Sequence, residues 1–304
     1  MSSTMLELMQ QTSNELGLVA PTYVAGNTSQ DVVQLLSLMN RAGYSLTKEY
    51  DWRALEKEYR FYTQSITTTG DTVNGSPIIT NVANTTGMVA DKWMASTGEG
   101  NGIPQDCTVV SVVGSTVTMN QPMQATGTGV SITFGQTKYD LPPDYETITD
   151  RTQWDKSKHW EALGPEDAQQ WQWLKSGYIS TGPRIRWRIL GKYFQTWPIM
   201  NTNEYMGYEY RSKGWAEAAD GTVKNSFTQD TDTTVFDDSL MVLYTKLKFF
   251  QIKNFDTTAL QQEFDRYLSV CKANDKGSAT LSFAPYPSKV LIGYANIPDT
   301  GYGS

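Results

Sequence analysis

The stretch Pro183–Leu190 reads PRIRWRIL, and Gly191–Trp197 continues it as GKYFQTW. Charged and apolar residues alternate in its first half, and a period of two predicts a strand with one apolar and one charged face. Leu190-Gly191-Lys192-Tyr193 fits a two-residue hairpin turn, because a type II′ turn favours glycine at its first central position. The stretch therefore predicts an antiparallel hairpin.

Counting outward from the turn sets the register of this hairpin. The expected pairs are Leu190 with Tyr193, Ile189 with Phe194, Arg188 with Gln195, Trp187 with Thr196, and Arg186 with Trp197. One face then carries Ile185, Trp187, Ile189 and Phe194 as core, and the other carries Arg184, Arg186, Arg188 and Trp197. We expect a third strand, roughly Tyr205–Arg211, to add Glu209 to the charged face.

Three interpretations of the charged face compete. It is a solvated sheet face with cross-strand ion pairs and an Arg–Trp stack, each contributing ~0.2–1 kcal/mol. Alternatively it is a subunit or partner interface, since Arg, Trp and Tyr are enriched at buried anchors. Sequence-specific DNA binding fits poorly, because the formal net charge is −7 and such binding needs a basic surface. The first two interpretations stay open.

Composition sets further limits on the class of protein. The chain has 304 residues and 39% hydrophobic content, which indicates one large or two smaller globular domains. We expect no membrane association, because no run of 18 apolar residues occurs, and no secretory signal is visible. Cys107 and Cys271 are isolated, which predicts free thiols and folding in a cytoplasm.

Few residues suggest catalysis or metal binding. The single histidine, His159, rules out zinc sites built on histidine pairs, and no G-x-S-x-G motif accompanies it. The acidic cluster Asp230, Asp232, Asp237 and Asp238 lacks the glycine and glutamate of an EF-hand. Asp237 or Asp238 is instead interpreted as a helix cap. We predict a non-enzyme with no catalytic, metal or cofactor site, although carboxylates scattered in sequence leave a hydrolase open.

The expected fold class is α+β, with a helical core, a small antiparallel sheet, an inserted all-β module and an extended C-terminal arm. The discontinuous core covers residues 1–68 and 136–275, the insert 69–135, and the arm 276–304. Helices are expected at Met5–Leu16, after Thr28 or Ser29, from Gly164-Pro165 through 177, and after Asp237 and Asp256. The insert is rich in Gly, Thr, Val and Ser, with a second hairpin turn at 113–116. The arm keeps Phe283, Tyr286 and Tyr294, which suggests a segment laid along a partner.

The order of these features resembles the head-to-tail adaptors of short-tailed bacteriophages, the tail tubular protein A-like family. The resemblance covers most of residues 1–66 and 137–275. It rests on YDWRAL (50–55), the Y-x-L-P-x-D-Y segment (139–145), WQWLKSG (171–177), WRILG (187–191) and EYRSKGWAEAADGTVKNSFTQDTDT (209–233). The insert departs from the family plan and resembles small β modules of other phage structural proteins.

The resemblance implies a structural virion protein without catalytic residues or cofactors. Such a protein forms a ring of about twelve identical copies that docks under the portal protein and carries tail nozzle or fibre proteins. It would be assembled in the host cytoplasm and sit at the head–tail junction, where duplex DNA passes through during genome ejection without sequence-specific binding. The acidic net charge agrees with a channel that does not hold DNA.

A glycan-binding tail or capsid accessory protein, using exposed Trp faces, is the alternative function. The candidate protein-interface residues are Arg184, Arg186, Arg188, Trp197, Glu209, Phe283, Tyr286 and Tyr294.

Overall fold

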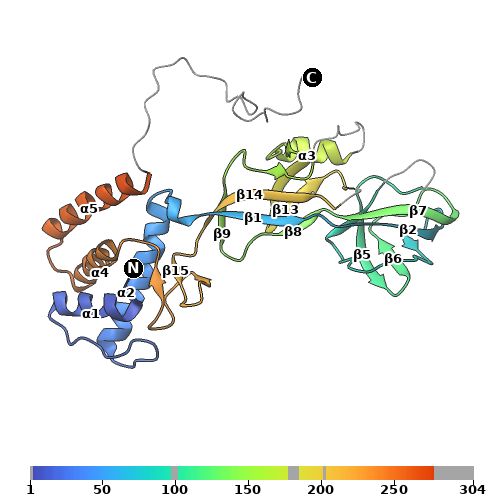
Figure 1. Cartoon of the computed structure of the whole chain (residues 1–304). Helices are drawn as coiled ribbons and strands as arrows, with labels where there is room; N and C mark the ends of the chain where they lie inside the picture. Colours follow the sequence, from blue (N-terminus) through green and yellow to red (C-terminus); the bar gives the residue numbers. More distant parts are fainter. Residues whose placement is uncertain (1–2, 97–101, 177–184, 201–202, 277–304) are drawn as a thin grey trace, which may run out of the picture.

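The structure, a computed structural model, describes residues 3–96, 102–176, 185–200 and 203–276. These residues form a helical head, a central β body and a barrel, arranged in a row (Figure 1). They contain five α-helices and seventeen strands, with 30% helix and 31% strand.

The expected α+β class, a helical core with one small sheet, is wrong. The strands form four antiparallel sheets of five, three, three and six strands, and the fold is mostly β. The error arose because many of the additional strands have only two to four residues, such as β10 (Trp154–Asp155) and β15 (Ala216–Glu217). Such strands are too short to show a period of two.

The head consists of α1 (Met5–Leu16), α2 (Gln30–Glu49), α4 (Asp238–Lys253) and α5 (Thr258–Lys276). The predicted bounds of the first helix are confirmed, and the side chain of Thr4 caps it in a capping box with Glu7. Asp237 caps α4 by accepting a hydrogen bond from the Leu240 amide at 3.0 Å. These caps satisfy amides that have no partner within the helix.

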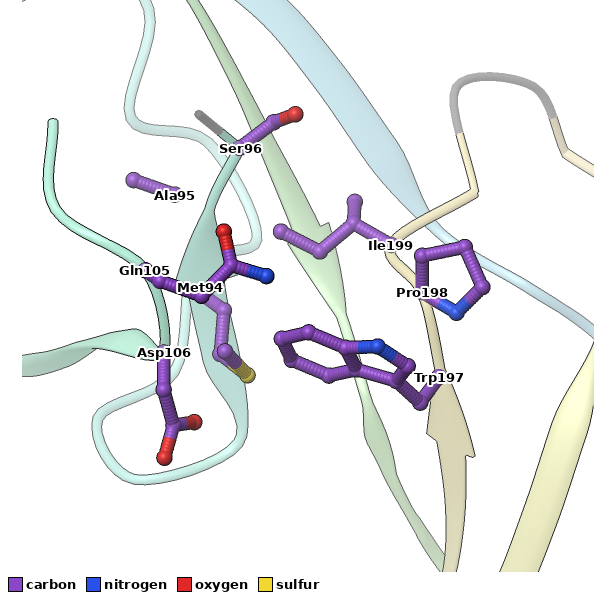
Figure 2. Close-up of a pocket in the computed structure, with 8 residues that line it drawn as sticks. All are labelled: Met94, Ala95, Ser96, Gln105, Asp106, Trp197, Pro198 and Ile199. Atoms are coloured by element: carbon purple, nitrogen blue, oxygen red, sulfur yellow. The ribbon is translucent and has the colours of Figure 1, made fainter. Parts of the chain in front are cut away.

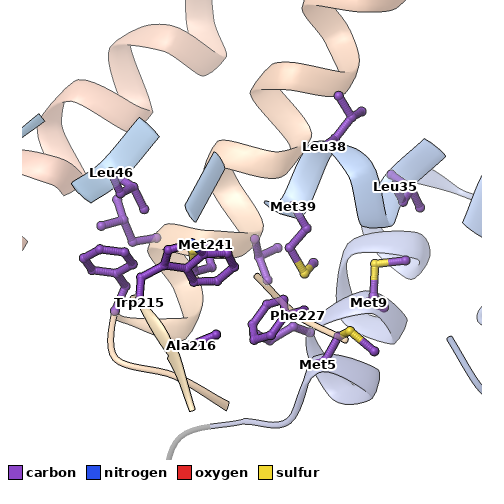
Figure 3. Close-up of a cluster of buried hydrophobic side chains, with 14 of the residues drawn as sticks. Met5, Met9, Leu35, Leu38, Met39, Leu46, Trp215, Ala216, Phe227 and Met241 are labelled. Carbon is purple, nitrogen blue, oxygen red and sulfur yellow. The ribbon is translucent and has the colours of Figure 1, made fainter. Parts of the chain in front are cut away.

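The core of the head is a cluster of methionine, leucine and aromatic side chains (Figure 3). Trp215 enters it from the chain that follows the β body, and its ring meets the Phe227 ring edge-on, with centroids 4.7 Å apart. Gly43 lies within helix α2, and its lack of a Cβ leaves room for the Trp215 ring. A 3-10 turn, η1 (Arg53–Leu55), then leads into the first strand.

The β body contains two sheets. In the first, β1 (Glu56–Tyr62), β14 (Tyr205–Ser212), β10 and β11 (Trp160–Glu161) follow one another, and β9 (Tyr145–Ile148) pairs with β14. In the second, the order is β12 (Arg186–Leu190), β13 (Tyr193–Trp197) and β8 (Lys138–Asp140). An aromatic core with Trp187, Phe194 and Tyr208 joins them.

The predicted hairpin is confirmed in every described pair. Leu190 opposes Tyr193 and Arg186 opposes Trp197, as counting from the turn predicts. Gly191 has a φ of 61°, a left-handed value that a residue without Cβ adopts at little cost. Ile185, Trp187 and Phe194 are buried in the aromatic core, so the apolar face of the hairpin is also confirmed.

The barrel is a six-stranded sheet that nearly closes on itself. Its order is β2 (Ser65–Thr72), β7 (Gly127–Gln136), β4 (Trp93–Ala95), β5 (Cys107–Val113), β6 (Thr116–Met119) and β3 (Ile78–Ile79). Backbone hydrogen bonds of 2.8 and 3.0 Å between Asp71 and Thr80 bring β3 back to β2. The chain enters and leaves side by side, since the Gln136 amide donates to the Gln64 carbonyl at 2.8 Å.

The fourth sheet has three short strands, β16 (Val223–Lys224), β15 and β17 (Thr233–Thr234), and lies between the β body and α4. Two aspartates of the acidic cluster hold its loop. Asp232 is fully buried and accepts hydrogen bonds from Lys224 Nζ and the Thr228 amide, both at 2.7 Å. Asp230 accepts from the amides of Val24 and Ala25. The cluster is therefore structural.

Short helix α3 (Ala168–Lys175) packs beside the hairpin sheet. Its N-cap is Asp167, which accepts from the Gln170 amide at 2.6 Å. The expectation that Pro165 stands in the first turn is wrong, because this proline precedes the cap by two residues. Pro165 instead belongs to the loop in which the Glu166 amide donates to the Trp187 carbonyl at 3.1 Å.

Candidate interaction surfaces

The arginine face of the hairpin is covered by the protein's own loop before α3. Arg186 Nη1 lies 2.9 Å from Glu166 Oε1, and the Glu166 side chain is only 6% exposed. Arg188 Nη1 makes a long contact of 3.5 Å with the Asp167 carbonyl. Arg184 lies outside the described residues. Arg186 is therefore engaged in an ion pair within the chain, although its side chain is still 32% exposed.

Trp197, the aromatic residue expected on this surface, is buried at 5% exposure. It packs with Met94 of β4 and with Trp171 and Leu174 of α3. Strand alternation explains the contact with the barrel, because Trp93 points into the barrel core while its neighbour Met94 points out. Trp197 thus joins the β body, α3 and the barrel within the chain.

A small cavity of about 60 Å³ lies at this junction (Figure 2). Met94, Trp197 and Ile199 form its apolar side, and Asp106 lies at its edge. Asp106 Oδ1 is 2.8 Å from Lys175 Nζ, which links the barrel to the end of α3. The barrel is therefore held to the β body by side-chain packing and an ion pair in addition to its two connecting segments.

Glu209 lies on a different sheet from the arginines. The third strand of the hairpin sheet is β8, and β14, which carries Glu209, pairs with β1 instead. Seven residue pairs join β14 to β1, whereas β8 has three residues. The long pairing with β1 therefore prevails over the more usual pairing of strands adjacent in sequence.

The outer face of the β1–β14 pair is exposed, and we call it the outer sheet face; it comprises Glu58, Arg60, Tyr62, Tyr205 and Glu209. Glu58 directly opposes Glu209, and like charges so placed repel. Hydrogen bonds from Arg60 and Lys156 lower the pKa of Glu58 to about 2. Glu209 is exposed and makes no ion pair in the described part of the chain. Among the expected interface residues that the structure describes, Glu209 is the only one that is exposed and makes no ion pair.

Asp144 organises the junction between the head and the β body. Its carboxylate accepts hydrogen bonds from Ser212 Oγ at 2.7 Å, Tyr210 OH at 2.9 Å and Lys57 Nζ at 3.1 Å. Burial by itself would raise the pKa of Asp144, but the three donors outweigh burial and lower it. We call Lys57, Asp144, Tyr210 and Ser212 the neck.

Two ion pairs reinforce the neck from the side of the head. Lys48 of α2 pairs with Glu146 of β9, and Asp51 pairs with Arg211 of β14. Burial followed by the hydrogen bond to Asp144 raises the pKa of Tyr210, so this hydroxyl stays protonated and remains a donor. Asp144 is the aspartate of the motif Y-x-L-P-x-D-Y, but the spacing of that motif gave no sign that this carboxylate would be the central acceptor.

Other predicted features have plain structural places. Both cysteines are free, Cys107 fully buried in the barrel and Cys271 partly buried on α5, and burial raises the pKa of each thiol to about 11. Within the described ranges, no group of three or more His, Cys, Asp or Glu side chains is placed to hold a metal ion. None of the helices that the structure describes is long and apolar enough to cross a membrane.

The arm residues Phe283, Tyr286 and Tyr294 lie outside the described residues.

Comparison with known proteins adds no further candidate. No known protein family matches the sequence, and no curated protein matches it. The candidate surfaces are therefore defined by the geometry of the chain itself.

Proposed function

We propose that the chain is a structural protein of a short-tailed phage virion, a ring-forming head-to-tail adaptor. It joins the portal to the tail and surrounds the path of the DNA, and it does not act as an enzyme. The proposal starts from the sequence resemblance over residues 1–66 and 137–275. Its main structural support is that three of the five segments carrying the resemblance, 50–55, 139–145 and 209–233, meet at and beside the neck.

Three of these five segments supply contacts there. From YDWRAL, Asp51 forms an ion pair with Arg211 of the segment EYRSKGW. The Y-x-L-P-x-D-Y segment supplies Asp144, and EYRSKGW supplies Tyr210 and Ser212 to its carboxylate. The same segment continues to Trp215 in the head core. Segments more than 150 residues apart in sequence thus form one unit.

A stiff neck suits a ring of identical subunits. Closed symmetry requires every copy to present its surfaces at the same angle. A flexible joint between the head and the β body would let that angle vary from copy to copy. Hydrogen bonds and ion pairs on both sides of Asp144 fix this joint. The elongated row of head, body and barrel (Figure 1) then lets each copy contact different partners at its two ends.

The charge balance supports the same role. A net charge of −7 per copy is multiplied in a ring, and an acidic lining does not release counterions from DNA as a basic one would. Duplex DNA can therefore slide past without being held.

The test is the assembly state of the purified full-length chain. We expect closed rings in negative-stain images and a single large species in native mass spectrometry, with no retention of duplex DNA at low salt. A chain that stays monomeric at every concentration, or that binds duplex DNA in a salt-dependent way, would contradict the proposal.

A glycan-binding accessory protein is the second candidate, and one observation favours it. Trp173 on α3 is 45% exposed and borders a depression of about 320 Å³ with Asp167, Gln169 and Gln170. An exposed indole beside amide and carboxylate groups is suited to stacking against a sugar ring. A glycan array with the wild type and Trp173→Ala separates the candidates, since the adaptor proposal expects no binding from either.

A further inference from the structure

An exposed apolar tip with two lysines lies at the turn between α4 and α5. Ile252 is 51% and Phe255 is 56% exposed. Phe255 is fixed in place, because its amide donates to the Phe250 carbonyl at 3.0 Å and the two rings meet edge-on. Lys248 and Lys253 lie over rings of their own helix and make no ion pair in the described part of the chain. We call Lys248, Ile252, Lys253 and Phe255 the knob.

A pocket of about 290 Å³ lies at the other end of α5, and we call it the socket. Its apolar lining is Trp52, Val235, Phe236 and Cys271, with the exposed Ala54 of η1 beside them. Asp237, Asn274 and Asp275 complete the lining, which holds two carboxylates and no cation. The nearest lysines of α5, Lys272 and Lys276, lie over the ring of Tyr50 instead.

The knob and the socket of one chain are too far apart to meet. Helix α5 has 19 residues and is therefore about 28 Å long. The knob precedes its first turn, and Cys271, Asn274 and Asp275 of the socket stand in its last turns. Figure 1 shows α5 running from the α4–α5 turn at the far end of the head toward the start of β1.

We infer that the knob of one copy docks in the socket of the next, with Phe255 in the pocket and Lys248 and Lys253 facing Asp237 and Asp275. This inference rests on the proposed ring and names its lateral contact. Because the two surfaces differ and lie at opposite ends of one helix, the contact is heterologous and repeats from copy to copy. Such repetition closes into a ring when the rotation per copy permits.

Residues 277–304 of the same chain are the competing occupant of the socket, because they begin directly after α5. Charge favours the knob. The knob brings two lysines beside an aromatic side chain, whereas residues 277–304 contain one lysine and one aspartate. Opposite charge across an interface also suppresses wrong partners and fixes register.

Two variants that leave the fold intact test the contact by sedimentation velocity. Phe255→Asp removes the knob at an exposed turn, and Ala54→Trp fills the socket from an exposed position. Each alone should weaken self-association by about thirtyfold or more, the effect of losing an interface anchor. Mixed together they should give a 1:1 dimer and nothing larger, because only one intact knob and one intact socket remain.

Cross-linking gives a direct readout of the same contact. Ile252→Cys places a thiol on the knob, and native Cys271 already lines the socket. A short bismaleimide should then produce a ladder of covalent oligomers, which Cys271→Ser abolishes. The matched control is Val113→Cys, a 74% exposed position on the barrel, which should yield no ladder.

The outcomes separate this inference from the proposed function. Wild-type rings that tolerate Phe255→Asp overturn the knob contact and leave the adaptor role standing. A 1:1 dimer from the mixed variants, with open fibres from the wild type, supports the contact and overturns the ring. Loss of assembly on truncation after Lys276, with Phe255→Asp unaffected, assigns the socket to residues 277–304 and overturns the inference. Monomers throughout overturn both.

Discussion

The Trp215 ring lies so close to Gly43 of α2 that a Cβ added at Gly43 would come within 2.4 Å of it. Both residues are fully or almost fully buried, so neither the helix nor the ring has free space to move into. This contact ties the chain that leaves the β body to the longest helix of the head.

Gly43→Ala is therefore expected to destabilise the protein although alanine favours helix. Overpacking costs about 1–3 kcal/mol, which exceeds the gain of about 1 kcal/mol from helix propensity. Urea unfolding should show a lower midpoint. In a double-mutant cycle, Trp215→Phe should cost less in the Gly43→Ala background than in the wild type. Additive effects would mean that the two residues do not share the space.

Asp144→Asn should weaken the neck and flatten the acid dependence of stability. The folded-state pKa of Asp144 is lowered, so its stabilisation is present above the unfolded value of about 3.9. It is lost as the pH falls through the folded pKa. Loss of the charge should cost about 1–3 kcal/mol at pH 7.

The measurement is urea unfolding at a series of pH values from neutral to acidic. The exposed Asp150 supplies the control, and Asp150→Asn should change neither the midpoint at neutral pH nor the slope below pH 5. An Asp144→Asn variant that loses stability in acid as steeply as the wild type would rule out Asp144 as the source of the slope.

Arg186→Gln should destabilise more than Arg188→Gln. Removing Arg186 leaves the nearly buried Glu166 carboxylate without its cation, and an uncompensated buried charge costs about 3–5 kcal/mol. Arg188 makes only the long contact with the Asp167 carbonyl, so its loss should change the free energy of unfolding by less than about 1 kcal/mol. Thermal unfolding compares the two, and adding Glu166→Gln should restore part of the loss in Arg186→Gln alone.

Met94→Glu should separate the barrel from the β body without unfolding the barrel. Met94 points away from the barrel core and contacts Trp171 and Trp197, so a carboxylate there is buried without a partner. We expect Trp fluorescence to shift to longer wavelength and calorimetry to resolve two transitions. Val113→Glu, at an exposed barrel position, should leave a single transition. One transition in both variants would contradict the prediction.

Local patterns predicted those parts of the fold that local forces decide. The hairpin register follows from the turn at Gly191 and from alternation, and the start of α4 follows from the cap at Asp237. No local sequence pattern indicates that β14 pairs with β1 or that β4 packs against Trp197. The arginine face therefore looked exposed in sequence, because the cover it receives comes from residues 94 and 166–174.

The candidate site was predictable to a smaller extent than the fold. Glu209 is exposed as expected, although on the outer sheet face and not beside the arginines. The socket had no signal in sequence, since its lining comes from residues 52–54, 235–237 and 271–275. The knob carried one signal, apolar residues in the last turn of a helix and the turn after it, but the apolar residues of KFFQIKNF also fit the buried face of an amphipathic helix.

The hydrogen bond between the Gln136 amide and the Gln64 carbonyl places the two ends of the barrel side by side, so another domain can replace the barrel. Because its two ends are one hydrogen bond apart, the rest of the chain can close over that point without spanning a gap, at little cost in loop entropy. A replacement domain needs only adjacent termini and an apolar side chain to cover Trp197. The position is thus a natural point for gaining or losing a domain, and a fluorescent protein with adjacent ends should be tolerated there.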